Sequence, residues 1–369
     1  MISYTAISPF EITIGAPLPF DVFLPDGTLL LSRGSRITSE QTRLYLLENA
    51  HKLSGRQQSL GSVFSRMQAL ADRLGQLEHD YLHHLGRDDW LYRVQVLARE
   101  LIDISDDDPD AAFAVMHLDI HHSYDVTHHV VAGLICSRLA LSNCFSTSER
   151  FSLVCGAITH DIALLHDRQQ LDGRSEWTAT DHARIREHCQ QGCDLLREVG
   201  VEDRLWLQVV HEHHERLDGS GCAGLRDREL APPSRILALA DSFSAMLRNR
   251  PYRERLLAKP ALATLYADPQ GRYDQGLTAS LIYELGLYPP GSLLRLASRE
   301  MAIAVRPTPG EIRYPMIAAI ADPAGHPMYR AAPRDPRAEE TAIVSLLPPE
   351  KAGLVRNLLP DCWKRMQSA

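Results

Sequence analysis

The spacing of apolar residues divides the chain into regions of different character. Between residues 111 and 286, apolar positions recur at helical spacing in one segment after another, and no stretch alternates as a strand would. On either side, short apolar runs are separated by proline, glycine and polar residues, which is typical of small β-sheets. We therefore expect a mainly α protein with an all-helical bundle at about 111–286 and small β-rich units at both ends.

The central region is expected to contain a series of helices joined by short connections. Glycine, proline and N-cap residues mark where each apolar stripe begins and ends. The predicted helices cover 111–141, as one long helix or two consecutive ones, then 149–165, 181–199, 204–215, 233–247, 261–266 and 273–285.

Residues 1–53 are predicted to form a β-rich N-terminal accessory unit. The turn signal Pro25-Asp26-Gly27 between two apolar runs predicts a hairpin, and a helix at about 39–48 should close the unit. Residues 54–110 are predicted to be a polar linker followed by one or two connecting helices, which end near residue 104.

The last part of the chain, residues 287–369, is predicted to be a β-rich C-terminal extension. Short apolar runs at 293–296, 302–305 and 317–320 are separated by proline and glycine, as expected for strands. A short terminal helix is expected from about Pro348, because proline is favoured in the first turn of a helix.

Composition excludes several functional classes. The 369 residues are 44% hydrophobic and 23% charged, near globular averages, and no apolar stretch is long enough to span a membrane. A net charge of −8 argues against binding of a nucleic acid polymer. The seven cysteines include no CxxC pair and the N-terminus shows no signal-peptide pattern, so we expect a reduced, cytoplasmic chain.

Lysine and histidine are distributed very unevenly. Only four lysines occur, none of them between residues 53 and 258, so a Gly-Lys-Ser/Thr phosphate loop is absent and no lysine nucleophile is available there. Twelve of the seventeen histidines, in contrast, fall between His117 and His214. This concentration of imidazoles points to metal chemistry.

Three blocks within this region combine histidine with carboxylates. His160-Asp161 follows an apolar helix, where the turning backbone allows both side chains to reach one ion. His213-His214 ends another helix before a glycine-rich loop. Asp241 lies inside an apolar helix, where an unpaired carboxylate would be costly to bury and a cation would remove that cost.

Seven residues are therefore candidate metal ligands. Imidazoles and carboxylates without thiolates suit iron, manganese or zinc rather than calcium. Their number is sufficient for two ions that share a bridging carboxylate, an arrangement used for in-line phosphoryl displacement. The candidates are His128, His160, Asp161, His188, His213, His214 and Asp241.

The ordered blocks resemble the signature of HD-GYP domains, a bacterial subgroup of the HD superfamily of metal-dependent phosphohydrolases. The resemblance covers about residues 111–286 and implies an HD-type helical bundle. It also implies hydrolysis of the second messenger cyclic di-GMP to pGpG and/or GMP at a two- or three-metal centre. The blocks are His160-Asp161, then Arg186-Glu187-His188 with Gly192, then residues 213–221, Ala240-Asp241 and Arg250-Pro251-Tyr252-Arg253.

The resemblance further implies how the ligands are shared, with Asp161 and His160 as the catalytic residues. Asp161 would bridge two divalent ions of iron or manganese, with zinc, nickel and magnesium as alternatives. Where members with a third metal carry a glutamate, this chain has Tyr124, so two ions are expected. The first ion would be held by His128, His160, Asp161 and Asp241, and the second by Asp161, His188, His213 and His214.

Substrate-binding residues are also implied by the resemblance. Arg250 and Arg253 stand where the family binds ligand phosphates, a task that suits guanidinium groups. Gly221 and Cys222 fall at the Gly-Tyr-Pro motif, which contacts substrate and docks diguanylate cyclase (GGDEF) domains.

The chain departs from the family pattern at several positions near the expected site. Leu164 stands where the family has a lysine after its His-Asp pair, and Cys222-Ala223 replaces Tyr-Pro. Ser244 replaces a further aspartate three residues after Asp241.

These features lead to one main hypothesis and two alternatives. The main hypothesis is a cytoplasmic, metal-dependent phosphodiesterase of cyclic di-GMP. The alternatives are a degenerate HD-GYP protein that binds metal or cyclic di-GMP and signals through protein contacts, and a hydrolase of another nucleotide. Besides cyclic di-GMP, a GGDEF domain and a second copy of the chain are the candidate partners, with no nucleic acid polymer and no membrane span.

Overall fold

A computed structural model of the chain shows two compact units, Met1–Ser62 and Val63–Ala369. Within the described ranges, no helix combines the length and the apolar character needed to cross a bilayer. The structure describes residues 4–7, 12–15, 18, 20, 22–24, 29–31, 35–53, 62–166, 178–249, 254–354 and 358–366.

The N-terminal unit is a small antiparallel sheet with one helix. Its strands β1 (Tyr4–Ala6), β4 (His51–Leu53), β2 (Val22–Phe23) and β3 (Leu29–Leu31) lie in that order across the sheet. The pairing of β2 with β3 confirms the predicted hairpin, although the turn residues themselves lie outside the described ranges. Helix α1 (Glu40–Asn49) begins at the N-cap Ser39, as the sequence predicted.

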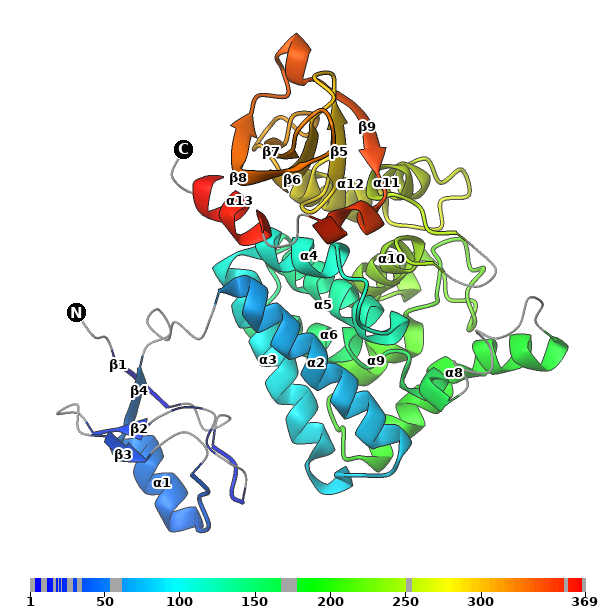
Figure 1. Ribbon diagram of the computed structural model, residues 1–369. Helices are drawn as coiled ribbons and strands as arrows, with labels where there is room; N and C mark the ends of the chain where they lie inside the picture. The colour runs from blue at the N-terminus through cyan, green and yellow to red at the C-terminus, as the bar shows by residue number, and fades with distance from the viewer. Residues whose placement is uncertain are drawn as a thin grey trace. The chain divides into compact units, whose positions relative to one another are not determined.

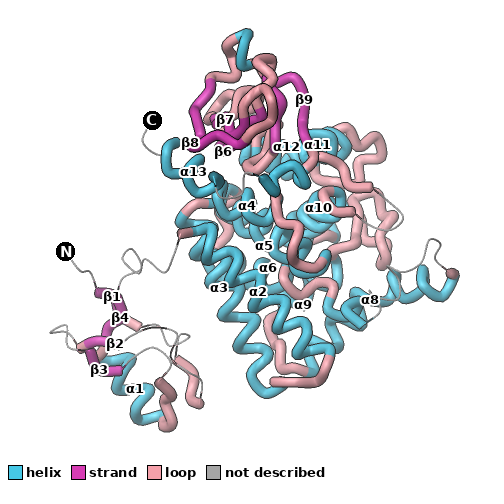
Figure 2. Tube along the Cα trace, viewed as in Figure 1, coloured by secondary structure: helices cyan, strands magenta, loops and turns pink. Residues whose placement is uncertain are grey.

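The second unit is built mainly of helices, and strands are confined to one part of it (Figure 2). This confirms the mainly α fold class. Its α-helices within the helical part are α2 (Val63–Leu82), α3 (Trp90–Asp107), α4 (Pro109–His117), α5 (Tyr124–Ser142), α6 (Thr147–Ala157), α8 (Ala179–Glu198), α9 (Arg204–Glu212), α10 (Pro232–Met246), α11 (Ala258–Tyr266) and α12 (Gln275–Leu285).

Helix α5 forms the centre of the bundle. Every residue from Val126 to Ser137 is buried, which is characteristic of a helix with neighbours on all sides. Helices α3, α4, α6 and α10 pack against it. His128 therefore projects from a fully enclosed part of the molecule rather than from its surface.

The predicted segment 111–141 contains two helices rather than one. Helix α4 ends at His117, and α5 starts anew at the N-cap Ser123, whose hydroxyl accepts a hydrogen bond from the Val126 backbone N–H at 3.2 Å. Helix α6 begins with a capping box between Ser146 and Glu149 and ends before His160. The chain then turns, so the segment predicted as one helix to residue 165 is interrupted at the His-Asp pair.

Helices α2 and α3 share the hydrophobic core of the bundle. Leu74 of α2 and Leu101 of α3 are buried in one cluster with Val130 of α5 and Val154 of α6. Although the sequence presented these helices as a connection, they cover α4 and α5 and complete the helical layer around them. The division of the chain into four parts stays a prediction.

A five-stranded antiparallel sheet follows the helices. Its central strand, β6 (Met301–Arg306), is buried on both faces: Ile303 belongs to one apolar cluster, and Ala302 and Ala304 belong to another. Figure 1 shows this sheet at one end of the bundle, with α13 (Leu359–Met366) beside it. The strand order is β8 (Pro327–Arg334), β7 (Met316–Ala321), β6 (Met301–Arg306), β5 (Leu293–Leu296) and β9 (Ile343–Leu347).

Charged groups join the sheet to the bundle. Arg306, at the end of β6, contacts Asp108 and Asp110 at the start of α4. Arg138 of α5 contacts Asp110 at 2.8 Å and Glu284 of α12 at 2.7 Å. Burial raises the pKa of Asp110, and the two arginines act against that rise. The guanidinium groups of Arg138 and Arg306 therefore lie against buried carboxylates where the sheet meets the helices.

The crossing of α6 and α9 leads to a stability prediction. These two helices position His160 and His213, which follow them closely in the chain. At Gly156 an added Cβ would lie 2.3 Å from Val209 Cγ2. We expect Gly156→Ala to lower the free energy of unfolding by about 1–3 kcal/mol through overpacking. Urea denaturation followed by circular dichroism measures this change.

Gly192→Ala is the matched control. This helical glycine has room for a Cβ, whose nearest neighbour would be Val210 Cγ1 at 3.5 Å. Alanine there should leave stability unchanged or raise it by up to about 1 kcal/mol, because it has the higher helix propensity. Equal destabilisation by both variants would contradict the close contact between α6 and α9.

Candidate metal centre

The structure brings the seven candidate ligands together from five parts of the bundle. Each lies where a helix ends or where a buried helix faces the centre, so short stretches of rigid backbone fix their positions. His128 lies on α5, His160 and Asp161 in the turn after α6, His188 on α8, His213 and His214 just after α9, and Asp241 on α10.

One group of ligand atoms surrounds His128. Its Nε2 lies 3.2 Å from His160 Nε2 and 3.1 Å from Asp241 Oδ1. His160 Nε2 lies 3.6 Å from the same oxygen. Two imidazole nitrogens and a carboxylate oxygen thus converge on one point.

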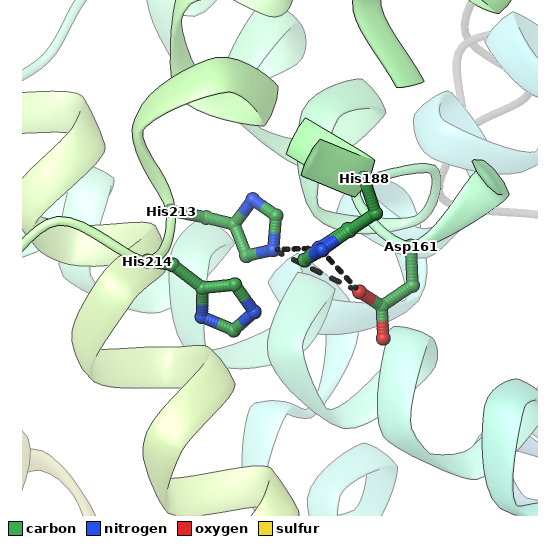
Figure 3. Close-up of side chains that lie close together, drawn as sticks. All are labelled: Asp161, His188, His213 and His214. Atoms are coloured by element: carbon green, nitrogen blue, oxygen red, sulfur yellow. Dashed lines mark hydrogen bonds and ion pairs between the residues drawn. The ribbon is translucent and has the colours of Figure 1, made fainter. Parts of the chain in front are cut away.

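A second group surrounds His188 and includes the residues shown in Figure 3. His188 Nε2 lies 3.2 Å from His213 Nε2 and 3.4 Å from Asp161 Oδ1. With His214 added, one ligand atom from each of the four residues lies within 4.8 Å of every other. His214 also approaches the first group, since its Nδ1 is 3.7 Å from Asp241 Oδ2.

Asp161 belongs to both groups. Its Oδ1 faces His188 and His213, at 3.4 and 3.7 Å from their Nε2 atoms. Its Oδ2 faces His128 and His160, at 3.9 Å from each Nε2. One carboxylate therefore presents a separate oxygen to each histidine group, which is the geometry of a bridging ligand.

Hydrogen bonds on the outer side fix the histidine tautomers. His160 Nδ1 lies 2.8 Å from the Ala157 carbonyl and His213 Nδ1 lies 2.7 Å from the Val210 carbonyl. Because a carbonyl only accepts, each Nδ1 carries the proton, and each neutral ring turns an unprotonated Nε2 toward the centre. Buried lone pairs that face one another in this way repel unless a cation lies between them.

Ser244 gives His128 the same orientation. Its hydroxyl donates to the Asp241 carbonyl at 3.0 Å and therefore accepts from His128 Nδ1, which lies 2.8 Å away. His128 Nε2 is then unprotonated as well. The serine that replaces a family aspartate thus still supplies the hydrogen-bond acceptor behind this histidine.

Burial favours the neutral form of two histidines in the centre, His128 and His214. His128, His160, His188 and His213 are fully buried, whereas the His214 side chain is 27% exposed, so the centre meets solvent beside His214. Desolvation lowers the pKa of His128 to about 3 and holds that of His214 well below its usual value. His128 and His214 are therefore neutral at neutral pH, the form in which imidazole binds metal.

Asp241 is charged despite its burial. Desolvation acts to raise its pKa, but the polar surroundings formed by His128, His160 and His214 outweigh that effect and hold the pKa well below the usual value. The centre thus offers neutral imidazoles and an ionised carboxylate. This donor set fits divalent ions that accept nitrogen and oxygen ligands, such as iron, manganese or zinc.

Tyr124 lies one helical turn before His128, where the sequence resemblance led us to look for a third-metal glutamate. Its ring stacks on His128, with centroids 5.1 Å apart and planes 20° apart. An aromatic face thus lies on this side of His128 in place of a carboxylate ligand.

The structure describes only part of the expected substrate site. Arg250 and Arg253 lie outside the described residues. Gly221 and Cys222 lie in the loop after α9, which the Glu215 carboxylate holds through the backbone N–H groups of Ala223 at 2.6 Å and Leu225 at 2.8 Å. These two hydrogen bonds to Glu215 therefore hold the loop segment that carries Gly221 and Cys222.

One histidine next to the centre has a partner that sequence reasoning missed. His129 Nδ1 lies 2.8 Å from Glu78 Oε1 of α2, and its ring packs edge-on against His160 at 5.0 Å. Although burial opposes protonation, the carboxylate raises the pKa of His129. Because Glu78 lies far away in sequence, no local spacing connects it to this histidine.

Comparison with known proteins places this site in a family. Residues 117–277 match the HD domain family. In the search of solved structures, the chain resembles Bd1817, an HDG"Y"P protein from Bdellovibrio bacteriovorus, with a TM-score of 0.53 and 15% identity over 76% of this chain and 98% of that chain. This similarity concerns the fold.

Several curated proteins are similar over the same region. A cyclic di-GMP phosphodiesterase of Pseudomonas aeruginosa is 25% identical over 202 residues, which is 53% of this chain and 48% of that protein. The cyclic di-GMP phosphodiesterase response regulator RpfG of Xanthomonas campestris pv. campestris is 32% identical over 158 residues, 41% of this chain and 40% of the relative.

A third relative carries a different substrate in its name. The 3'3'-cGAMP-specific phosphodiesterase 1 of Vibrio cholerae is 29% identical over 138 residues, 37% of this chain and 32% of that protein. The chain thus spans half or less of the length of these curated relatives. The family match, the helical fold and the His-Asp centre agree on one point: residues 117–277 are similar to HD domains, and the fold is similar to that of an HD-GYP-type protein.

Proposed function

We propose that this protein is a metal-dependent phosphodiesterase that hydrolyses cyclic di-GMP to pGpG and/or GMP. The position of Asp161, with one oxygen toward each histidine group, carries the proposal. Two ions that share a carboxylate suit in-line displacement at phosphorus. The names of the Pseudomonas and Xanthomonas relatives support cyclic di-GMP as the substrate.

Each histidine group would hold one divalent ion. Iron and manganese are the preferred metals, and zinc, nickel and magnesium are the alternatives. Bound ions would supply a hydroxide near neutral pH and offset the charge that develops on the phosphate. The protein itself would orient the ligands: hydrogen bonds to Nδ1 of His128, His160 and His213 direct the Nε2 atoms of these rings toward the ions. The first ion would be bound by His128, His160, Asp161 and Asp241, and the second by Asp161, His188, His213 and His214.

The remaining parts of the proposed active site bind the nucleotide. Arg250 and Arg253 would hold its phosphates, and the loop with Gly221 and Cys222 would contact it. Leu164 is buried where the family has a lysine, so this chain has no cation at that position. Charge stabilisation would therefore depend on the ions and the arginines.

A second candidate function is hydrolysis of 3'3'-cGAMP. The Vibrio relatives that carry this substrate in their names favour it, and so does the change from Tyr-Pro to Cys222-Ala223 in the substrate loop. This candidate keeps the same centre and the same chemistry. It differs only in which base the loop accepts.

Direct turnover tests the proposed function. Protein purified anaerobically and loaded separately with iron and manganese should convert cyclic di-GMP to linear pGpG or GMP, detected by chromatography. Faster conversion of 3'3'-cGAMP would instead support the second candidate. Binding of cyclic di-GMP without conversion under either metal would overturn the enzyme and leave a protein that signals by binding.

The shared ligand leads to a prediction about metal content. Asp161→Ala should remove most of both ions, because one carboxylate serves both groups. Elemental analysis of purified protein measures the loss. Asp227→Ala, at a surface position, should retain the wild-type content. Full occupancy in Asp161→Ala would refute the bridge.

The hydroxyl behind His128 leads to a second prediction. Ser244→Ala removes the acceptor that orients His128, so we expect the affinity for one ion to fall about 10- to 100-fold. Competition with a chelator measures this fall. Ser234→Ala is the control: it removes a buried hydroxyl from the same helix, one that has no hydrogen-bond partner among the described residues. Equal effects of the two variants would show that Ser244 does not orient His128.

A further inference from the structure

Arg216 directly follows the turn that carries two of the candidate metal ligands, and no step of the proposed chemistry uses it. It comes two residues after His214, in the stretch that leads from α9 into the loop. Its guanidinium group contacts three oxygen atoms and one aromatic ring. Two of these oxygens belong to the turn itself, whereas the third oxygen and the ring belong to other parts of the bundle.

Within the turn, Arg216 binds backbone carbonyls. Its Nη1 donates to the carbonyl of His213 at 3.2 Å and to that of Glu215 at 2.8 Å. Both carbonyls lie just past the end of α9, where no further helical turn supplies donors. The cation therefore fixes the backbone of the turn, while the hydrogen bond to the Val210 carbonyl fixes the ring of His213.

The other terminal nitrogen of the same guanidinium reaches helix α10. Arg216 Nη2 donates to Ser242 Oγ at 3.2 Å, and Ser242 is the direct neighbour of Asp241. The Tyr273 hydroxyl donates to the same serine oxygen at 3.0 Å. Ser242 and Tyr273 are both buried. One buried hydroxyl thus connects the turn after α9, the helix of Asp241 and the segment that leads into α12.

The ring of Tyr273 gives the guanidinium group a further support. Arg216 Cζ lies 5.2 Å from the ring centroid, within the range of a cation–π contact. The backbone reinforces this pairing, because the Leu217 N–H donates to the Arg272 carbonyl at 3.0 Å. A planar, forked cation can meet two carbonyls, a hydroxyl and a ring face at once, which the compact ammonium group of a lysine cannot do.

We propose that Arg216 is a positioning residue that fixes the His213-His214 turn against the helix of Asp241. The two ligand groups approach each other here, since His214 Nδ1 lies 3.7 Å from Asp241 Oδ2. Helix α10 is buried around Asp241, whereas the turn follows a helix end and is held by Arg216. Loss of the guanidinium would therefore displace the turn and the ligands of the second ion. This inference rests on the metal assignment of the proposed function.

Chelator competition with the full-length protein tests this role. Manganese-loaded wild type should bind two ions, and Arg216→Ala should bind one of them about 10- to 100-fold more weakly, as expected when a group behind a metal ligand is removed. In cobalt-loaded protein, the same variant should change the visible absorption spectrum, because the arrangement of ligands around one ion changes. Wild-type affinity for both ions in Arg216→Ala would overturn the proposal.

Arg235→Ala is the matched control. Arg235 lies on α10, is partly buried and also donates to two backbone carbonyls, those of Asp227 at 2.6 Å and Leu230 at 3.1 Å. These carbonyls belong to the segment that leads into α10 and not to the turn. The variant should therefore bind both ions as wild type does. An equal loss of affinity in both arginine variants would show general destabilisation and would overturn the positioning role.

Two milder changes serve where Arg216→Ala does not fold. Arg216→Lys keeps the charge without the fork, and Ser242→Ala removes only the hydroxyl that Arg216 reaches. Each should weaken the same ion, and in the double variant the two losses should not add, because both act through one contact. Wild-type affinity in both single variants, or full additivity in the double variant, would overturn the proposal.

Metal binding and turnover together separate this inference from the proposed function. Loss of one ion in the Arg216 variants, with no nucleotide hydrolysis by wild type, would support the positioning role and count against the enzyme alone. Nucleotide hydrolysis by wild type, with both ions bound as tightly in Arg216→Ala, would overturn the positioning role and leave the enzyme. Absence of any bound ion in wild type would overturn both.

Discussion

The close approach of histidine Nε2 atoms within a buried centre is the constraint on which the rest of this structure depends. His160 and His213 donate their Nδ1 protons outward to backbone carbonyls, and each meets another histidine Nε2 at 3.2 Å. The folded chain therefore gathers nitrogen and oxygen ligand atoms at one place, where a divalent cation would stabilise them, and residues from five parts of the bundle hold this arrangement.

Parts of the chain beyond the matched HD domain support this centre. Glu78 of α2 pairs with His129, the neighbour of a candidate ligand, and thereby fixes the ring that packs edge-on against His160. Further out, Arg306 of β6 contacts the acidic start of α4. Since α4 packs on α5, the C-terminal sheet is connected through buried contacts to the helix that carries His128.

The sequence allowed the helical class and the set of converging residues to be predicted, because both depend on local signals. Helical spacing marks α5 and α10, and adjacent His-Asp and His-His pairs mark the chain turns. Contacts that depend on the path of a loop left no such signal. The path of the loop that carries Cys222 follows from the hydrogen bonds of Glu215, and the break between α4 and α5 follows from a serine cap that many helices tolerate internally.

The departures from the family pattern change the charge of the centre in a consistent direction. Relative to the pattern of the resemblance, Tyr124 and Ser244 each replace an acidic residue, and Leu164 replaces a lysine. The candidate centre therefore has fewer negative and fewer positive side chains around it. The carboxylates among the candidate ligands are Asp161 and Asp241. With two divalent ions they would leave an excess of two positive charges, which one phosphodiester and one hydroxide would neutralise. A centre with a third ion would need a further anion, and the stacked Tyr124 ring cannot supply one. The local charge balance thus agrees with the two-ion centre proposed above.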